Sequence, residues 1–120
     1  MALHINFQLI EDVLFVHLEG EVDHHVADSL RKAWRDEMFG RSCFNIVLDF
    51  THVQFMDSSG IGVILGRYKE IIGRDGLIAV YGMNETIQTI FYMAGLSKII
   101  KVTDNKEEAL SFMGVDVHAK

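Results

Sequence analysis

The sequence predicts one α/β domain with a mixed, mostly parallel sheet, an antiparallel N-terminal edge hairpin and about four helices. Three features of the 120-residue chain support this prediction. Two strand patterns follow one another at the N-terminus, helical and apolar strand patterns then alternate, and only short turns separate them. Helices that alternate with apolar strands favour parallel pairing through right-handed crossovers.

The predicted hairpin occupies residues 2–18. Residues 2–10, ALHINFQLI, alternate apolar and polar side chains, which is typical of a half-exposed strand. Its covered side is expected to carry Leu3, Ile5, Phe7 and Leu9. Residues 13–18, VLFVHL, are almost all apolar and suit a strand covered on both faces. Glu11 and Asp12 lie between the two and indicate the turn.

Two helices and a buried strand follow the hairpin. Residues 22–38 repeat apolar side chains at helical spacing, and Asp23 is the expected N-cap. Residues 44–50, FNIVLDF, indicate the strand, and residues 59–73 a helix that ends at Gly73. The apolar faces are expected to carry Val26, Ala27, Leu30, Ala33, Trp34 and Met38 in the first helix, and Ile61, Ile64, Leu65, Tyr68, Ile71 and Ile72 in the second.

The C-terminal part continues the alternation. It predicts a strand, a helix capped by Asn84 and a final strand, at residues 77–82, 84–95 and 98–102. Asp104 and Glu107 predict a capping box for a last helix within residues 105–114. We expect a single domain over residues 1–114 and a frayed tail over residues 115–120.

Composition excludes several classes of protein. The formal net charge of −6 gives no electrostatic basis for non-specific binding to nucleic acid or acidic membranes. No apolar run approaches the roughly 20 residues of a membrane helix, and MALHINFQ lacks the features of a secretory signal. Cys43 is the one cysteine, so an internal disulfide is impossible and a buried apolar role is expected. These features favour a soluble cytoplasmic protein.

Catalytic and metal motifs are not recognisable. Gly60, Gly62 and Gly66 follow the spacing G-x-G-x-x-x-G, whereas a dinucleotide loop needs its third glycine one residue earlier. No G-x-S-x-G elbow surrounds the serines, and the S-x-x-K at residues 29–32 lacks its companion motifs. His24 and His25 are adjacent and diverge by about 100° on a helix, so they do not converge on a metal. We predict no enzyme activity, no metal and no cofactor.

Residues 55–62, FMDSSGIG, form the start of the second helix. The first turn of a helix has unpaired N–H groups and the positive end of the dipole, which suit a phosphorylated serine. Gly60 and Gly62 would leave the backbone open to another protein. The alternative is plain N-capping by Asp57 or Ser58, with the glycines packed against the sheet. This pattern does not choose between Ser58 and Ser59.

A second helix start lies in residues 20–24, GEVDH. If one sheet contains both preceding strands, residues 20–24 and 57–62 lie together at strand carboxyl ends. Ligand and partner sites of α/β sheets gather at such ends.

Three segments carry a resemblance to a known family. GEVDHHVADSL, FMDSSGIGVILGRYK and MAGLSKIIKV resemble the anti-sigma factor antagonists of the STAS family, and the similarity runs through essentially the whole chain. The resemblance implies a β–α superhelix and a regulatory phosphorylation site at Ser58, the first serine of the family's D-S-[ST]-G motif. The partner-binding residues that it implies are Asp23, Ser58, Ser59, Gly60, Ile61 and Gly62.

The resemblance also implies a switch. The unphosphorylated protein, a monomer when free, would dock on an anti-sigma factor serine kinase similar to SpoIIAB and release the sporulation sigma factor F. Phosphorylation at Ser58 would end docking, and a phosphatase similar to SpoIIE would reset the protein. A long-lived complex with the ADP-bound kinase is also implied. A stand-alone STAS scaffold and a nucleotide-binding module remain the alternatives.

Overall fold

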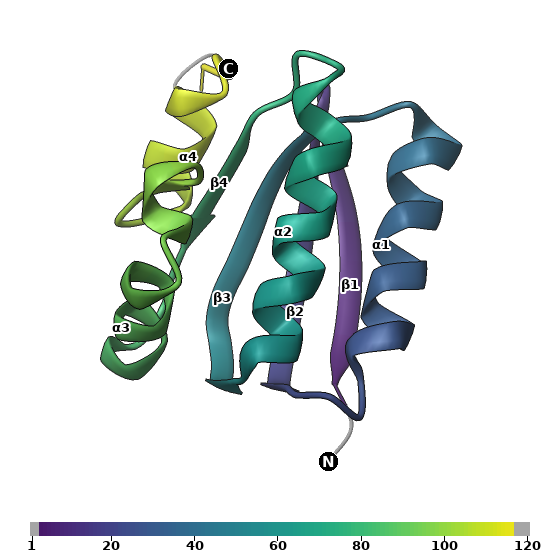
Figure 1. Cartoon of the computed structure of the whole chain (residues 1–120). Helices are drawn as coiled ribbons and strands as arrows, with labels where there is room; N and C mark the ends of the chain where they lie inside the picture. Colours follow the sequence, from purple (N-terminus) through teal and green to yellow (C-terminus); the bar gives the residue numbers. More distant parts are fainter. Residues whose placement is uncertain (1–2, 117–120) are drawn as a thin grey trace.

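The computed structural model describes residues 3–116 and contains one five-stranded sheet in the order β1-β2-β3-β4-β5 (Figure 1). β1 pairs antiparallel with β2, and every other neighbouring pair is parallel. The strands are β1 (His4–Ile10), β2 (Val13–Val22), β3 (Asn45–Met56), β4 (Ile78–Tyr81) and β5 (Lys101–Val102). This arrangement confirms the predicted mixed sheet with an antiparallel edge hairpin.

Four α-helices cover the two faces of the sheet unequally. They are α1 (Ala27–Arg41), α2 (Ser58–Ile72), α3 (Glu85–Met93) and α4 (Lys106–Phe112), with a 3₁₀ turn, η1, at Leu96–Lys98. The larger core unites one face with α1, α2 and α3 and contains the fully buried Trp34, Phe50 and Phe91. α4 packs its Ala109 and Leu110 on the other face, over a smaller core.

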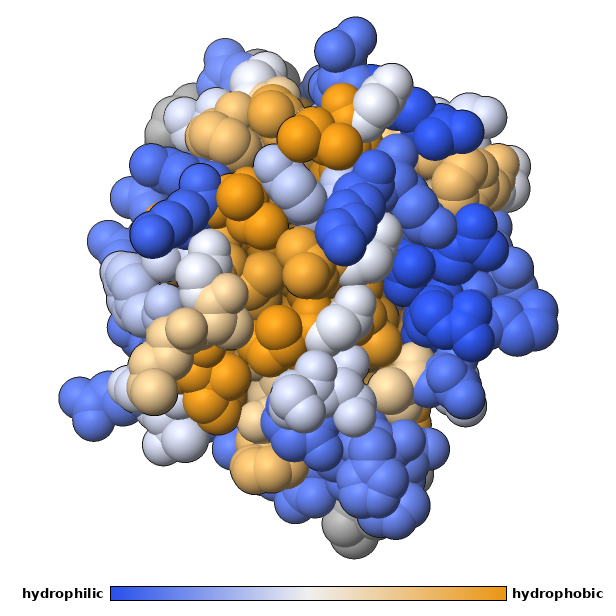
Figure 2. Space-filling view, in the orientation of Figure 1, coloured by the Kyte–Doolittle hydropathy of each residue, from blue (hydrophilic) through white to orange (hydrophobic). Residues whose placement is uncertain are grey.

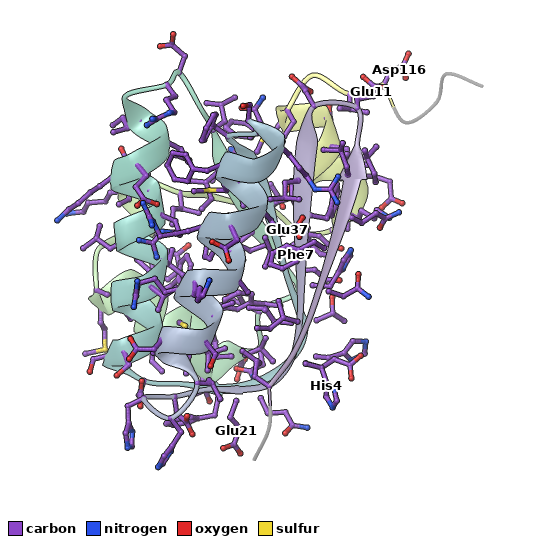
Figure 3. All side chains as sticks on the ribbon, turned by 90° about the vertical axis from the view of Figure 1, so that its right-hand side faces the viewer. His4, Phe7, Glu11, Glu21, Glu37 and Asp116 are labelled. Atoms are coloured by element: carbon purple, nitrogen blue, oxygen red, sulfur yellow. The ribbon has the colours of Figure 1, made fainter. Side chains whose placement is uncertain are left out.

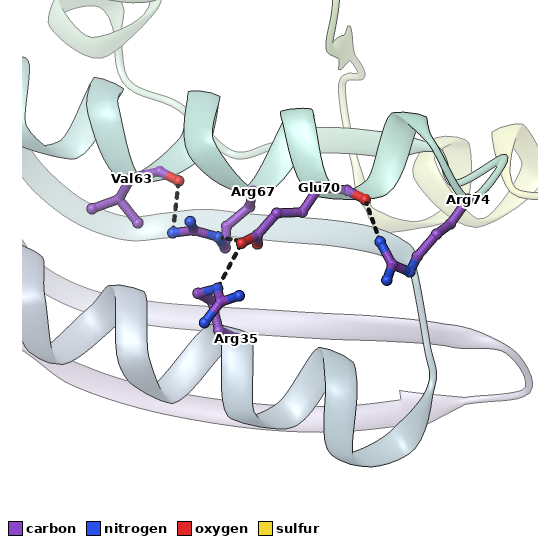
Figure 4. Close-up of polar contacts among 5 residues, drawn as sticks. All are labelled: Arg35, Val63, Arg67, Glu70 and Arg74. Carbon is purple, nitrogen blue, oxygen red and sulfur yellow. Dashed lines mark hydrogen bonds and ion pairs between the residues drawn. The ribbon is translucent and has the colours of Figure 1, made fainter.

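A partly buried ion-pair cluster joins α1 to α2 (Figure 4). Glu70 accepts from Arg35 Nε at 2.6 Å and from Arg67 Nε at 2.7 Å. Burial alone raises the pKa of Glu70, but the hydrogen bonds and charges of Arg67 and Arg35 outweigh it and lower the pKa. The two helices are therefore locked together by one carboxylate.

Strand lengths differ from the prediction at three places. β2 continues past residue 18 to Val22, and β3 continues past residue 50 to Met56. Their extensions place only some side chains inward, such as Val53 and Met56, and were not recognised as strand because polar residues interrupt them. The final strand is shorter than predicted, because Lys98 lies in η1 and Ile100 donates its N–H to Leu96 O.

Two predicted caps are wrong. α1 begins at Ala27 after Val26, with no side-chain cap, and Asp23 instead accepts from the His25 N–H at 2.9 Å in the turn before the helix. The capping box of α4 lies one residue later than predicted. Asn105 accepts from the Glu108 N–H at 2.8 Å, while Glu108 accepts from the Asp104 N–H at 2.8 Å. The predicted cap of α3, Asn84, is confirmed by its bond from the Ile87 N–H.

Burial also corrects two details of the predicted faces. α2 turns Arg67 toward the core, whereas Ile72 at its end is 56% exposed. Leu9, expected on the covered side of β1, is 45% exposed. Val115, the first residue of the expected frayed tail, is buried and donates its N–H to Leu110 O. Residues 117–120 of that tail lie outside the described part of the chain.

Candidate functional site

The candidate site lies where β2 and β3 end side by side. The two strands are parallel, and their last residues, Val22 and Met56, are partners in the register. The segments that follow, residues 23–26 and the start of α2, are therefore neighbours at the carboxyl edge of the sheet. This juxtaposition is the one expected from the sequence.

Asp57 holds the two segments together. Its Oδ1 accepts from the Ser59 N–H at 2.8 Å, which makes Asp57 the N-cap of α2. Its Oδ2 accepts from the His24 N–H at 3.2 Å, and its own N–H donates to Val22 O at 3.3 Å. Of the two capping residues considered from the sequence, Asp57 therefore has this role, and Ser58 is left free of it.

Ser58 and Ser59 have different surroundings. Ser58 is the first residue of α2 and is exposed. Among the residues that the structure describes, none forms a hydrogen bond with its hydroxyl. Ser59 is half-buried, and its N–H is the donor that Asp57 caps. The geometry therefore makes Ser58 the more accessible hydroxyl at the positive end of the helix dipole.

The two glycines of this segment serve different purposes. A Cβ on Gly60 would lie 2.6 Å from Met56 Cγ and 3.0 Å from Val22 O, so Gly60 allows α2 to approach the strand ends. The expectation that Gly60 exposes backbone is wrong, because this residue is buried. A Cβ on Gly62 would have no atom within 4 Å, and Gly62 is exposed as expected. The loop thus uses its first glycine for packing and not as a phosphate cradle.

Asp23 lies beside the start of α2 with two histidines. Its carboxylate accepts from the His25 N–H and lies 3.6 Å from His25 Nδ1. His24 Nδ1 lies 3.7 Å from Asp57 Oδ2, and the two imidazoles are 4.0 Å apart. Burial acts to raise the pKa of Asp23, but the hydrogen bonds and charges of His25, with the charge of His24, lower it. Asp23 is thus held as a carboxylate at the rim of the site.

An apolar groove next to Ser58 was not predicted. Its lining comes from the end of β3, the first turn of α2 and the last turn of α3, namely Met56, Asp57, Ser58, Ile61, Ile90, Met93 and Ala94. Met93 is 83% exposed. In Figure 2, apolar residues, coloured orange, gather on the face of the molecule that carries α2 and α3. From the sequence, Met93 falls within the helix predicted over residues 84–95, and nothing in that pattern indicates a groove.

Two further searches cover residues 3–116. Within that range no cluster of three or more His, Cys, Asp or Glu side chains is arranged to hold a metal ion. In the same range, none of the helices combines the length and apolar character needed to cross a bilayer.

Known proteins resemble this chain over nearly its whole length. The model of the STAS domain matches residues 4–109. The anti-sigma F factor antagonist of Paenibacillus polymyxa is 43% identical over 115 residues, which are 96% of this chain and 98% of that protein. A putative anti-sigma factor antagonist from Thermotoga maritima has a TM-score of 0.86 at 25% identity, covering 90% of this chain and 92% of that chain. SpoIIAA of Bacillus in its phosphorylated form has a TM-score of 0.73 at 26% identity, covering 92% and 99%.

Proposed function

The chain belongs to the anti-sigma factor antagonists of the STAS-domain family, and on that premise we propose that it is an antagonist switched by phosphorylation of Ser58. Antagonists of this group are regulatory proteins and not enzymes, as predicted from the sequence. In the proposed cycle, the unphosphorylated chain docks on an anti-sigma factor kinase and releases the sporulation sigma factor F. A phosphatase similar to SpoIIE resets the phosphorylated chain in the cytoplasm.

The observation that carries the proposal is the setting of the Ser58 hydroxyl. It is exposed, it has no hydrogen-bond partner among the described residues, and it begins a 15-residue helix. A kinase can reach such a hydroxyl without opening the fold. Ser59, by contrast, is half-buried within the capped turn.

The surroundings of Ser58 explain how a phosphate would end docking. The groove beside it presents the apolar side chains of Ile61, Ile90 and Met93, which a partner would cover. A phosphate adds about −1.5 to −2 charges at pH 7. Placed at the rim of an apolar contact and next to the Asp57 carboxylate, these charges would have to lose water when a partner covers the groove. Docking therefore favours the neutral hydroxyl.

Other parts of the site support the partner contact. Gly62 leaves open space one helical turn beyond Ser58. Asp23 presents a carboxylate from the neighbouring loop. We assign Asp23, Ser58, Ile61 and Gly62 to the partner surface, Ser59 to the turn below it, and Gly60 to the packing that holds α2 in place.

Intact-mass measurement of the protein purified from its native host tests the proposal. We expect a population heavier by one phosphate, which a serine phosphatase removes and which the Ser58→Ala variant lacks. A scaffold or nucleotide-binding module would show no such population under sporulating conditions. The same result for wild type and Ser58→Ala would place any phosphate elsewhere and contradict the proposal.

A further inference from the structure

An exposed methionine lies in the apolar groove beside Ser58, and we propose that Met93 is a redox modification site. A peroxide would convert its thioether to a sulfoxide, which weakens docking until a reductase removes the oxygen. Met93 is the last residue of α3, lines the groove together with Ser58 and Ile61, and is 83% exposed. The effect on docking rests on the proposed function, in which a partner covers this groove, whereas the oxidation itself does not.

Exposure distinguishes Met93 from the other methionines that the structure describes. Met38 and Met56 are fully buried, and Met83 is only 9% exposed. Met113, after α4, is half-buried against the smaller core. Sulfur atoms, drawn in yellow, are visible between the helices and at a margin of the molecule (Figure 3). Because a peroxide must reach the lone pairs of the sulfur, oxidation follows exposure, and we expect Met93 to react first.

The single cysteine does not compete for the oxidant. Cys43 is buried, and its Sγ donates to Asp12 O at 3.1 Å. Burial raises the pKa of its thiol. Peroxides react with the thiolate, so a thiol held in this neutral form is a poor target. Among the sulfur-containing residues within 3–116, Met93 is therefore the one that solvent oxidants reach readily.

The modification makes an apolar surface polar. The thioether sulfur gives an electron pair to one peroxide oxygen, the O–O bond breaks, and the remainder of the peroxide leaves as water or an alcohol. The sulfoxide oxygen is a hydrogen-bond acceptor, and a partner that covers the groove would bury it beside the apolar Ile61 and Ile90. In the reverse step a dithiol is oxidised to a disulfide, the sulfoxide is reduced to the thioether, and its oxygen leaves as water.

Peptide mass spectrometry after mild treatment with hydrogen peroxide tests the chemical selectivity without any partner. We expect Met93 to gain one oxygen about tenfold faster than Met113, the half-buried methionine outside the groove, since the two differ in exposure. Methionine sulfoxide reductase with a dithiol should remove that oxygen from the folded protein. Equal rates at Met93 and Met113, or a faster reaction at Met113, would overturn the assignment whether or not the chain docks on a kinase.

Calorimetric titration of the purified anti-sigma factor kinase tests the effect on docking. Oxidised wild type, freed of peroxide before mixing, should bind about tenfold more weakly, because burial of an unpartnered polar group costs free energy. The reductase should restore its affinity. Met93→Leu keeps an apolar side chain without sulfur, so peroxide should leave its affinity unchanged.

Two outcomes would overturn the control of docking while the switch at Ser58 stands. They are an unchanged affinity of oxidised wild type and an equal loss of affinity in peroxide-treated Met93→Leu. A failure of untreated wild type to dock would instead contradict the proposed function together with this consequence of it. Selective oxidation of Met93, measured without the kinase, would still stand in that case.

Discussion

The carboxylate of Asp57 accepts a hydrogen bond from the backbone N–H of His24 at 3.2 Å, across the ends of two parallel strands. The other oxygen of the same carboxylate caps α2 through the Ser59 N–H. One side chain thus sets the position of the Ser58 hydroxyl relative to the loop that carries Asp23. The stability of this junction can be measured separately from partner binding.

Replacing Asp57 tests the junction. Asp57→Ala should lower the free energy of unfolding by about 1–2 kcal/mol for the lost N-cap and roughly 1 kcal/mol for the unpaired His24 N–H. Asp57→Asn keeps one acceptor oxygen, so its free energy of unfolding should fall by only part of this amount. Urea denaturation gives both values, with the highly exposed Asp28→Ala as control. If Asp57→Ala were no less stable than the control, the junction would have no structural role.

Glu70 predicts a specific dependence of stability on pH. Its pKa is lowered from 4.5 in the fold, because the hydrogen bonds of Arg67 and Arg35 outweigh burial. The ionised form therefore stabilises the fold above pH 4.5, and that contribution is lost as the pH falls through the lowered pKa. Glu70→Gln should cost about 2 kcal/mol at pH 7, since it breaks hydrogen bonds between charged groups.

The difference between wild type and Glu70→Gln should shrink as the pH falls below 4.5. Glu37→Gln is the control, because its ion pair with Arg41 is more exposed and worth less than about 0.5 kcal/mol. Chemical denaturation across the pH range measures both variants. If the difference in free energy of unfolding between wild type and Glu70→Gln did not depend on pH, the ion-pair cluster would not be its cause.

Gly62→Asp tests whether the partner approaches this helix face. Since a Cβ at Gly62 meets no atom within 4 Å, the variant should fold normally. The added carboxylate should obstruct docking and abolish phosphorylation by the kinase. Gly40→Asp, at an equally open glycine of α1, should leave docking unchanged. Normal phosphorylation of a folded Gly62→Asp protein would place the contact elsewhere.

Asp23→Asn separates a structural from a binding role. The structure shows that Asp23 does not cap α1 but accepts from the His25 N–H, and the Asn oxygen can accept the same bond. Stability should therefore stay nearly constant. Docking on the kinase should weaken by about 1–3 kcal/mol if the carboxylate receives a hydrogen bond from a charged partner group. Calorimetric titration measures the affinity for the kinase. An unchanged affinity would mean that Asp23 stabilises its own turn and does not contact the partner.

The sequence was most informative where local and tertiary signals agree. The alternation of helical and apolar strand patterns predicted a mostly parallel sheet with an antiparallel edge hairpin, and Asn84 was identified as a cap because its polar side chain directly precedes a periodic segment. The same reasoning failed for Asp23. Its side chain accepts a hydrogen bond from the His25 N–H in the preceding turn. α1 begins only at Ala27, and its N-cap position is Val26, a residue type that no capping preference indicates.

The groove beside Ser58 needed the fold. Met56, Ile61 and Met93 come from three elements, and no periodicity within one element shows that they converge. The choice of Ser58 over Ser59 likewise needed more than the pattern. The resemblance indicated Ser58, and the structure adds that this hydroxyl is exposed while Ser59 lies half-buried in the capped turn.

Phosphorylation and docking of three serine variants, assayed with the purified anti-sigma factor kinase and ATP, test the central claim most directly. Ser58→Ala should take up no phosphate and remain bound to the kinase, so that the sigma factor stays free without a phosphatase. Ser58→Asp should dock poorly, although one carboxylate only partly imitates a phosphate. Ser59→Ala should still be phosphorylated. Phosphate on Ser58→Ala, or its loss from a folded and docking-competent Ser59→Ala, would show that Ser58 is not the phosphorylated serine. Equal docking of Ser58→Ala and Ser58→Asp would contradict the charge switch itself.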